Sequence, residues 1–336
     1  MKRFRLAFIG AGNRANLVHY PSFADLDNVE IVGVCDIDAQ RLKNTCDKYH
    51  VPQDRRWTGG VLVYREMLDE VKPDGVAVIG QPHIMFDIWV YVLEHGYNLY
   101  IEKPMGITIH QARLLNMLAE KHNAVATVAF QRRITPVVMQ LREKCLAHGP
   151  ITHSLVRFYK CEPKPFLCAR DHMMDDCVHS IDTLRWVFDD RKIERVSSIC
   201  QSIGTPDVNY ISATLEFEGG GKGYLINNWT SGRRIFDIEM HAPGICAEAE
   251  HEKGGRYFEN GDTEGVPITA IDAAGSDAFH VYTGVENLAR DFVACCQDRS
   301  RRPASGFSNA IQTMEAAEII LAQALRRRNQ EEGVCC

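Results

Sequence analysis

The stretch FRLAFIGAGNRA, residues 4–15, decides the fold of this chain of 336 residues. Residues 4–9 are almost all apolar, as expected of a β-strand that is buried on both faces. The turn that follows has the pattern G-x-G-x-x-A. Its first glycine, Gly10, permits a tight turn, and its second, Gly12, lets the backbone approach a pyrophosphate, while the small Ala15 lets a helix pack closely on the strand. This spacing predicts a dinucleotide-binding unit.

A second apolar run, residues 30–35, ends in Asp36, which lies 24 residues after Gly12. A carboxylate near this spacing accepts a hydrogen bond from the ribose 2′-hydroxyl of the cofactor. It also repels a 2′-phosphate, so Asp36 favours NAD over NADP. Arg41 could accept such a phosphate and leaves NADP possible. Alternatively, Asp36 could cap the helix predicted over residues 39–49.

Strand and helix patterns alternate through the rest of the first 125 residues. We expect strands at 75–79, 98–101 and 124–129 and helices at 85–94 and 108–122. Repeated βα units of this kind form a parallel, doubly wound sheet, which binds a dinucleotide across the carboxyl ends of its strands. The predicted cofactor contacts at this edge are Gly10, Gly12, Asn13, Arg14, Asp36, Arg41, Gln81, Pro82, His83, Glu102 and Lys103.

Lys103 has a special place at this edge. It follows the strand at 98–101 directly and precedes Pro104, so its ammonium group should point at whatever occupies the crevice. The alternative is a solvated loop lysine.

Residues 174–188 have helical periodicity with two stripes. Apolar residues recur at steps of three and four, and Asp175, His179 and Asp182 share a neighbouring face. Asp175 near the start of the helix could hydrogen-bond His179 and fix its imidazole. The spacing alone is equally compatible with an Asp–His pair on the protein surface that has no catalytic role.

Together these motifs resemble the Gfo/Idh/MocA oxidoreductases, over essentially the whole chain. The elements that carry the resemblance are Gly10-Ala11-Gly12, Asp36, Gln81-Pro82-His83, the segment from Glu94 to Pro104, and the D-x-x-x-H-x-x-D pattern of residues 175–182. The resemblance implies a Rossmann domain over residues 1–125. A domain over residues 126–336 would follow, with a large open, mostly antiparallel sheet and closing C-terminal helices.

The resemblance also implies roles for individual residues. Lys103 corresponds to the catalytic lysine of the family, His179 to its acid/base histidine and Asp175 to the aspartate that orients the site. The chain departs from the family pattern at two places, Asp171-His172 and Cys177, where many members have glycine. These differences leave the identity of the substrate undetermined. Candidate substrate contacts are Arg133, Tyr159, Asp182 and Asn228.

The expected activity is hydride transfer between a nicotinamide cofactor and a secondary alcohol or ketone of a sugar, polyol or related cyclic compound. In this chemistry a base must take the hydroxyl proton, and an imidazole titrates in the right range. Two alternatives share the resemblance, namely an NAD-dependent glycosidase that works by transient oxidation and a non-catalytic nucleotide-sensing regulator. The presence of both Lys103 and His179 argues against the regulator.

The amino-acid composition limits the kinds of molecule that this protein is expected to bind. A net charge of −6 and a pI near 6.1 provide no field for nucleic acid or anionic membranes. No motif of metal-ligand spacing is present, and the twelve cysteines include no Cys-x-x-Cys. We expect a reduced, cytoplasmic protein without a metal.

The second half should form the open sheet and a homodimer or homotetramer through it. We predict its strands at 151–159, 193–202, 210–217, 222–230 and 234–241, an exposed excursion at 252–282, and closing helices at 286–296 and 309–327.

Overall fold

The computed structural model describes residues 3–162, 164 and 170–331. The chain forms two compact units. The first unit comprises Met1–Gln131 and Ala278–Ile311, and the second comprises Arg132–Asp277 and Gln312–Cys336. Within the described residues, no helix combines the length and the apolar character needed to cross a membrane.

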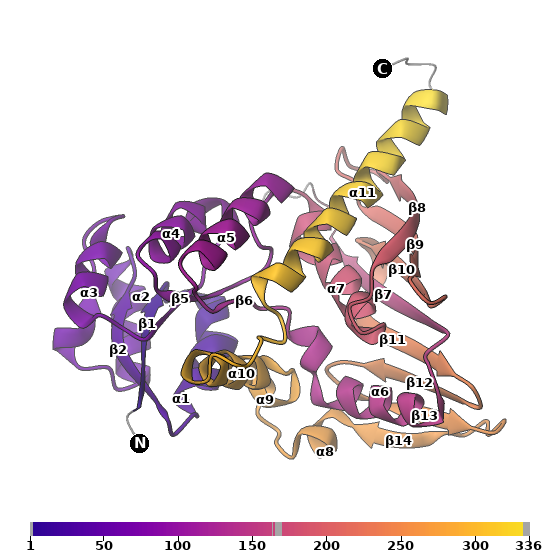
Figure 1. Cartoon of the computed structure of the whole chain (residues 1–336), viewed down its shortest axis with the longest axis horizontal. Coiled ribbons are helices and arrows are strands. Elements are labelled where there is room, and N and C mark those ends of the chain that lie inside the picture. Colours follow the sequence, from indigo (N-terminus) through magenta and orange to yellow (C-terminus); the bar gives the residue numbers. More distant parts are fainter. Residues whose placement is uncertain (1–2, 163, 165–169, 332–336) are drawn as a thin grey trace. The chain divides into compact units, whose positions relative to one another are not determined.

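The first unit is built on a six-stranded parallel sheet with the order β3-β2-β1-β4-β5-β6 (Figure 1). This order confirms the predicted doubly wound sheet, and it reverses direction between β1 and β4, where such sheets bind ligands. The strands are β1 (Phe4–Ile9), β2 (Val29–Cys35), β3 (Arg56–Trp57), β4 (Gly75–Val78), β5 (Asn98–Ile101) and β6 (Ala126–Val128).

Helices connect these strands, with bounds close to those predicted. They are η1 (Ala15–His19), α1 (Tyr20–Ala24), α2 (Ala39–Lys48), η2 (Gln53–Arg55), α3 (Val63–Val71), α4 (Pro82–Glu94), α5 (Ile109–Lys121) and η3 (Gln131–Ile134), the last of which begins at the end of this unit. Two further helices, α9 (Phe279–Tyr282) and α10 (Val285–Gln297), return from the far end of the sequence.

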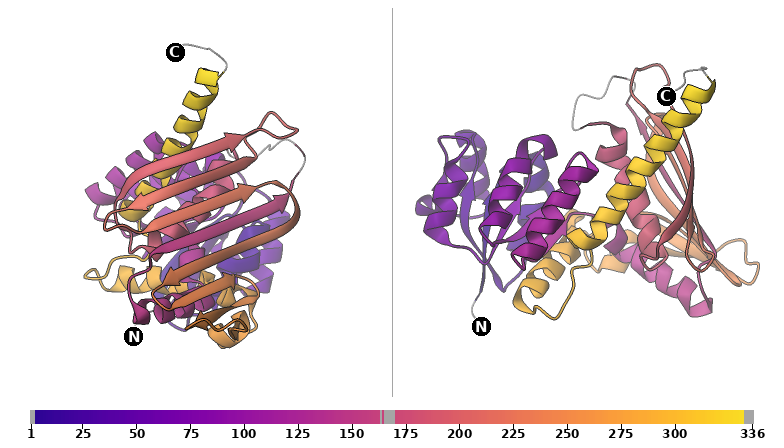
Figure 2. Two further views of the ribbon diagram at one scale, coloured as in Figure 1. Left: turned by 90° about the vertical axis from the view of Figure 1, so that its right-hand side faces the viewer. Right: turned by 45° about the horizontal axis from the view of Figure 1, so that its top comes forward.

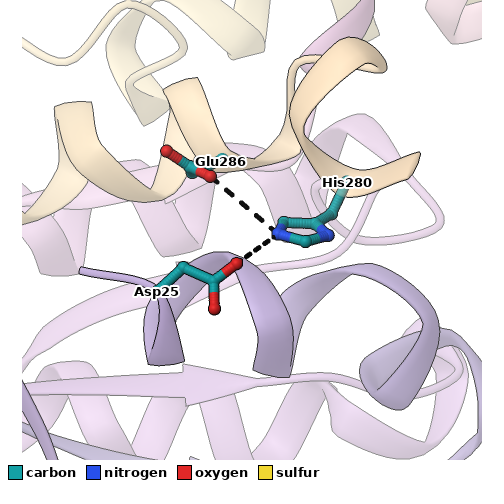
Figure 3. Close-up of side chains that lie close together, drawn as sticks. All are labelled: Asp25, His280 and Glu286. Atoms are coloured by element: carbon teal, nitrogen blue, oxygen red, sulfur yellow. Dashed lines mark hydrogen bonds and ion pairs between the residues drawn. The ribbon is translucent and has the colours of Figure 1, made fainter. Parts of the chain in front are cut away.

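The returning segment completes the core of the first unit. Phe292 of α10 packs edge-on against Phe4, Phe23 and Tyr100, with ring centroids 5.6 to 6.3 Å apart. Next to this contact, His280 of α9 bonds Asp25 through its Nε2 atom at 2.7 Å and lies 3.9 Å from Glu286 (Figure 3). The segment is therefore joined to α1 and the residue that follows it by an apolar contact and a hydrogen bond.

The second unit is built on an eight-stranded sheet with the order β14-β13-β12-β11-β7-β10-β9-β8. Every neighbouring pair is antiparallel except β7 and β10, as expected for a mostly antiparallel sheet. Its strands are β7 (His153–Cys161), β8 (Ile193–Gln201), β9 (Tyr210–Phe217), β10 (Lys222–Asn228), β11 (Thr230–Ala242), β12 (Ile245–Glu250), β13 (Gly254–Glu259) and β14 (Val266–Thr269).

Helices of the second unit cover only one face of this sheet. They are α6 (Pro136–His148), η4 (Met173–Cys177), α7 (Val178–Val187), α8 (Ala270–Ala274) and α11 (Phe307–Glu331), which begins at the end of the first unit. The left view of Figure 2 shows the opposite sheet face with no helix in front of it. Strand β9 explains this division, because Ile211, Ala213, Leu215 and Phe217 are buried while the residues between them are partly exposed.

The segment at 252–282 is exposed over most of its length, as predicted, but it is part of the regular structure and does not form a separate excursion. This region contains β13 and β14, which extend the sheet, and the short helices α8 and α9. Its glycines are part of the sheet, since a Cβ on Gly254 would lie 2.4 Å from the carbonyl oxygen of Ile268 and one on Gly255 would lie 2.3 Å from that of Glu248. Glycine at these positions allows close strand packing.

The helix predicted over 174–188 is present, but it begins as a π-helical turn, η4, and continues as α7. All the residues of the predicted apolar stripe are buried, which confirms that face. The polar stripe is more buried than expected, because His179 and Asp182 are only 4% and 1% exposed.

Candidate active site

The glycine turn after β1 has the geometry that a phosphate cradle requires. Gly10 adopts a φ of +104°, and a Cβ there would lie 2.1 Å from the carbonyl oxygen of Ile79. Only glycine fits this position. A Cβ on Gly12 would have no protein atom within 4 Å, so the backbone is open to a ligand. Asn13 and Arg14 follow as exposed residues at the start of the helix, and Ala15 is buried.

Asp36, at the end of β2, holds this turn in place. One carboxylate oxygen accepts a hydrogen bond from the backbone N–H of Ala11 at 2.7 Å, and the other accepts one from Asp38 at 2.8 Å. The alternative role of Asp36 as the cap of α2 is wrong, because Asp38 caps that helix. Arg41 lies 3.9 Å from Asp36 and 3.1 Å from Asp38, so its positive charge is close to the predicted ribose site.

Glu102, at the end of β5, is a buried centre of hydrogen bonds. Its carboxylate accepts bonds from Arg14 at 2.9 Å, from His19 at 2.7 Å and from the backbone N–H of Lys103 at 3.1 Å. Burial by itself would raise the pKa of Glu102, but Arg14 and His19 hold it well below its usual range. Burial lowers the pKa of His19, so a neutral imidazole donates to an ionised carboxylate.

These contacts join the loop that carries Lys103 to the first helix after the glycine turn. Lys103 itself is partly buried, and the peptide bond between Lys103 and Pro104 is cis. The third predicted segment begins α4, where Gln81 is the N-cap residue, Pro82 is buried and His83 is exposed. The structure thus brings the predicted cofactor residues to the carboxyl ends of β1, β2, β4 and β5 in the first unit.

The residues at this edge fit a dinucleotide. Gly12 has open space beside it, and Asp36 lies at the end of β2, the strand position whose acid binds the ribose in dinucleotide-binding folds. Sequence reasoning missed two exposed apolar side chains at the same edge, Ile37 and Ile84, which are 66% and 58% exposed. Both expose apolar surface at this edge, and the position of Ile37 directly after Asp36 in the sequence was the signal that could have identified it.

In the second unit, Asp175 and His179 lie at the junction of η4 and α7. Asp171 stabilises the start of this helical segment through two hydrogen bonds. Its carboxylate accepts one from Met174 N–H at 2.9 Å, and its carbonyl accepts one from Asp175 N–H at 3.0 Å. Asp175 is partly exposed, while His179 is almost fully buried. The buried Cys177 lies between them in the sequence.

A charged cluster lies beside this junction and was not predicted. Asp176, which is 5% exposed, accepts hydrogen bonds from Lys160 Nζ at 2.6 Å and from Trp229 Nε1 at 3.0 Å. The His172 ring stacks on Trp229 with centroids 4.4 Å apart, and burial lowers the pKa of His172. The departures from glycine in this region therefore fill space with a side-chain network. Lys160 also lies 3.3 Å from Glu162.

Two of the predicted substrate contacts, Arg133 and Asp182, bond to each other. The Arg133 guanidinium donates to both carboxylate oxygens of Asp182, one of them at 2.8 Å, and contacts Asp190 at 3.2 Å. Both side chains of the Arg133–Asp182 pair are almost completely buried. Burial raises the pKa of Asp182, and the adjacent guanidinium opposes that shift. Because the two side chains bond each other in a buried position, the pair connects η3 to α7 and has a structural role.

The other two predicted contacts lie away from α7. Tyr159 and Asn228 are register partners in β7 and β10. Their neighbours Phe158 and Asn227 are buried, and Asn227 contacts Ser180 of α7 through a hydrogen bond. Because side chains alternate along a strand, Tyr159 and Asn228 occupy the opposite sheet face. The structure does not bring them together with His179.

Comparisons with known proteins agree with this picture. Residues 4–130 match the oxidoreductase family with an NAD-binding Rossmann fold (GFO_IDH_MocA). The chain is 25% identical to the rhizopine catabolism protein MocA of Rhizobium meliloti, over 99% of both chains. It is 32% identical to D-glucoside 3-dehydrogenase of Escherichia coli, over 42% of this chain and 38% of that protein.

A solved structure supports the fold of the whole chain. A dehydrogenase from Chromobacterium violaceum superimposes with a TM-score of 0.86 and covers 99% of this chain and 98% of its own. The sequence identity is 20%, so this likeness establishes the fold.

Proposed function

We propose that this chain, whose residues 4–130 match the oxidoreductase family with an NAD-binding Rossmann fold, transfers a hydride between NAD and a secondary alcohol or ketone of a sugar, polyol or related cyclic compound. The main support is the fixed position of Lys103, whose loop is anchored by a buried, ionised Glu102 at the ligand-binding edge of the first unit. The relatives, a D-glucoside 3-dehydrogenase and a rhizopine catabolism protein, favour a cyclic, hydroxylated substrate.

In this proposal, NAD supplies the hydride acceptor when it is bound. His179 removes the substrate hydroxyl proton at a ring nitrogen, which raises the electron density on that oxygen. Lys103 donates a hydrogen bond from Nζ to the same oxygen and stabilises its developing negative charge. Asp175 orients the imidazole of His179.

We assign the remaining predicted residues to supporting tasks. Gly10, Gly12, Asn13 and Arg14 would hold the pyrophosphate, and Asp36 the adenosine ribose. The start of α4, with Gln81, Pro82 and His83, would form one wall of the cofactor crevice. Arg133 and Asp182 would shape the substrate side of the second unit through their buried pair.

A spectrophotometric screen tests this function. Reduction of NAD⁺ and of NADP⁺ is followed with sugars, inositols and sugar acids as substrates. We expect activity with at least one of them, and a loss of at least about 100-fold in kcat in both Lys103→Ala and His179→Ala. Lys121→Ala and His110→Ala, which alter exposed residues of the first unit, serve as matched controls and should retain full activity.

Two outcomes would replace the proposal. Cleavage of an aryl glycoside without net cofactor reduction would show a glycosidase that oxidises its substrate transiently. Tight binding of NAD by a wild-type protein that turns over none of the substrates would favour the nucleotide-sensing regulator.

We also propose that the protein assembles into a homodimer or homotetramer through the uncovered face of the second sheet (Figure 2). This face exposes Ile199 and Tyr224, which are 49% and 36% accessible, and the partly exposed Ile226 lies next to them. The register places Ile226 opposite Ser212, which in turn pairs with Ile199, so these side chains form one row across three strands. A second copy of the same face would cover this row.

A further inference from the structure

The second unit contains a small cavity with a charged lining near the ends of β11 and β12. Its volume is about 170 Å³. Three cationic residues (Arg132, Arg234 and Lys253), two acids (Glu250 and Glu252) and His251 contribute to its wall. One water molecule accounts for roughly 30 Å³ of the liquid, whereas pockets for whole ligands measure about 300–1,000 Å³. The cavity is therefore the right size for one functional group of a ligand.

His251 in this wall has unused hydrogen-bonding capacity. It is 3% exposed, and neither ring nitrogen makes a hydrogen bond with the described residues. Burial, and then the charge of Arg132, lower the pKa of His251 to about 3, although the carbonyl groups of Phe236 and Arg132 approach the ring and oppose the shift. The imidazole is neutral at pH 7 and carries one N–H donor. Buried polar groups normally have partners, so a ligand that accepts a hydrogen bond would complete this site.

The charges around the cavity favour an anion. Three positive side chains face two negative ones, which leaves one positive charge in excess. Lys253 pairs with Glu250 at 2.9 Å, but Arg234 lies 3.9 Å from Glu252 and its side chain is 68% exposed. An arginine guanidinium presents paired N–H donors that match the oxygens of a carboxylate or phosphate.

The cavity lies on the sheet face that carries the proposed acid/base residues. A series of ring contacts runs from His251 to Phe236, then Phe158, Trp229 and His172, with successive centroids 4.6, 4.9, 6.4 and 4.4 Å apart. Trp229 bonds Asp176, which is the immediate neighbour of Asp175.

Two basic side chains, Arg132 and Lys160, lie along the same series of rings between the cavity and Asp175. The Arg132 guanidinium lies 5.0 Å and the Lys160 ammonium 5.3 Å from the centre of the Phe158 ring. The basic groups thus continue from the cavity toward the turn that holds Asp175.

We propose that this cavity binds the carboxylate or phosphate group of a small molecule, and that this molecule is the substrate, a sugar acid or a sugar phosphate. The identification of the ligand as substrate rests on the function proposed above, whereas the anion site itself does not. The substrate class is thereby narrowed from sugars, polyols and related cyclic compounds in general to anionic carbohydrates.

Calorimetric titration of the full chain, without cofactor, tests the site. The probes are D-galacturonate and D-glucose 6-phosphate, with neutral galactose and glucose as their uncharged counterparts. We expect saturable binding of one anionic probe, which also distinguishes carboxylate from phosphate, and at least tenfold weaker binding of its neutral counterpart. Arg234→Gln should weaken anion binding at least tenfold, because it removes a lining cation and leaves Glu252 to repel the ligand.

Arg233→Gln is the matched control, because it removes the same charge from an adjacent exposed residue that is not part of the wall. It should change the affinity less than twofold. A second variant, His251→Leu, should weaken anion binding while it retains or raises the thermal midpoint of the ligand-free protein, since it removes a buried polar group without a hydrogen-bond partner.

Equal effects of Arg234→Gln and Arg233→Gln, or equal affinity for charged and neutral probes, would overturn the proposal. Its failure is distinguishable from that of the proposed function, because binding is measured without turnover. Anion binding in a protein that oxidises none of these substrates would retain the site and reject the dehydrogenase.

Discussion

At the residue scale, buried polar side chains determine how the nucleotide-binding edge is held. Asp36 accepts a hydrogen bond from the backbone of the neighbouring glycine turn. Glu102 accepts one from the backbone of Lys103 and two more from the side chains of Arg14 and His19. Their place at strand ends could be predicted from the sequence, because the alternation of strands and helices fixes which residues reach the carboxyl edge. Their partners could not, since Arg14 and Glu102 lie 88 positions apart.

Asp36→Ala should shift the cofactor preference toward NADP. The variant removes the predicted ribose acceptor and the charge that repels a 2′-phosphate. A hydrogen bond to a charged group contributes about 1.5–3 kcal/mol, so the ratio of kcat/KM for NAD⁺ to that for NADP⁺ should fall about 10- to 100-fold. The ratio is the informative quantity, because loss of the Ala11 contact would weaken both cofactors alike. Asp38→Ala, which removes the cap of α2, is the control, and an unchanged ratio in Asp36→Ala would reject the ribose role.

His251 should make the protein less stable as the pH falls below about 6.5. Its folded-state pKa is lowered to about 3, so the unfolded chain takes up a proton that the folded chain refuses. The stability is fully present above the unfolded pKa and is lost as the pH falls toward 3. At roughly 1.36 kcal/mol per pH unit, wild type should lose about 2 kcal/mol more than His251→Leu between pH 7 and pH 5. Urea unfolding at both pH values measures this difference, and parallel losses in the two proteins would contradict it.

At the element scale, the helix over 174–188 and the strands after residue 244 show where prediction from sequence succeeds and fails. Apolar periodicity located the helix, because burial of one face is a local property of the sequence. It did not reveal that α7 is also buried on its polar side, where Asp182 meets Arg133 from η3. Such a pair depends on contacts between distant segments.

The strands β13 and β14 were missed for a different reason. Glycine and acidic residues in this region resemble a loop by composition, whereas Gly254 and Gly255 allow neighbouring strands to approach closely. The candidate substrate contacts Tyr159 and Asn228 illustrate a similar difficulty. Their polar character suggested a site, but only the register shows which side of the sheet they occupy.

Breaking the buried Arg133–Asp182 pair should destabilise the second unit substantially. Asp182→Asn leaves a buried guanidinium without its full counter-charge, and loss of one partner of such a pair costs about 3–5 kcal/mol. The double variant Arg133→Met/Asp182→Leu should recover much of this loss, because it removes both buried charges. Chemical unfolding of the full chain gives the values. Glu216→Gln, whose partner Arg195 is 73% exposed, is the control and should unfold like wild type. A loss in Asp182→Asn no larger than in this control would argue against the buried pair.

At the scale of the whole molecule, the uncovered sheet face is the surface expected to join copies of the chain. Ile199→Glu should therefore lower the molar mass measured by light scattering to that of a smaller assembly. Ile271→Glu is a close control, because Ile271 on α8 is also 49% exposed. Removal of one apolar contact and introduction of a like-charge pair across a two-fold axis both act against association. An unchanged mass in Ile199→Glu, or an equal change in both variants, would exclude this face as the interface.

The return of residues 278–311 to the first unit has a consequence for biosynthesis. Phe292 fills a position between Phe4, Phe23 and Tyr100 that the amino-terminal segment cannot fill by itself. During translation, the ribosome must therefore add residues 132–277 before this aromatic cluster can close, which at ~5–20 residues per second takes on the order of ten seconds. For that interval the nascent nucleotide-binding half exposes apolar surface, and chaperones that hold emerging chains have a defined target there.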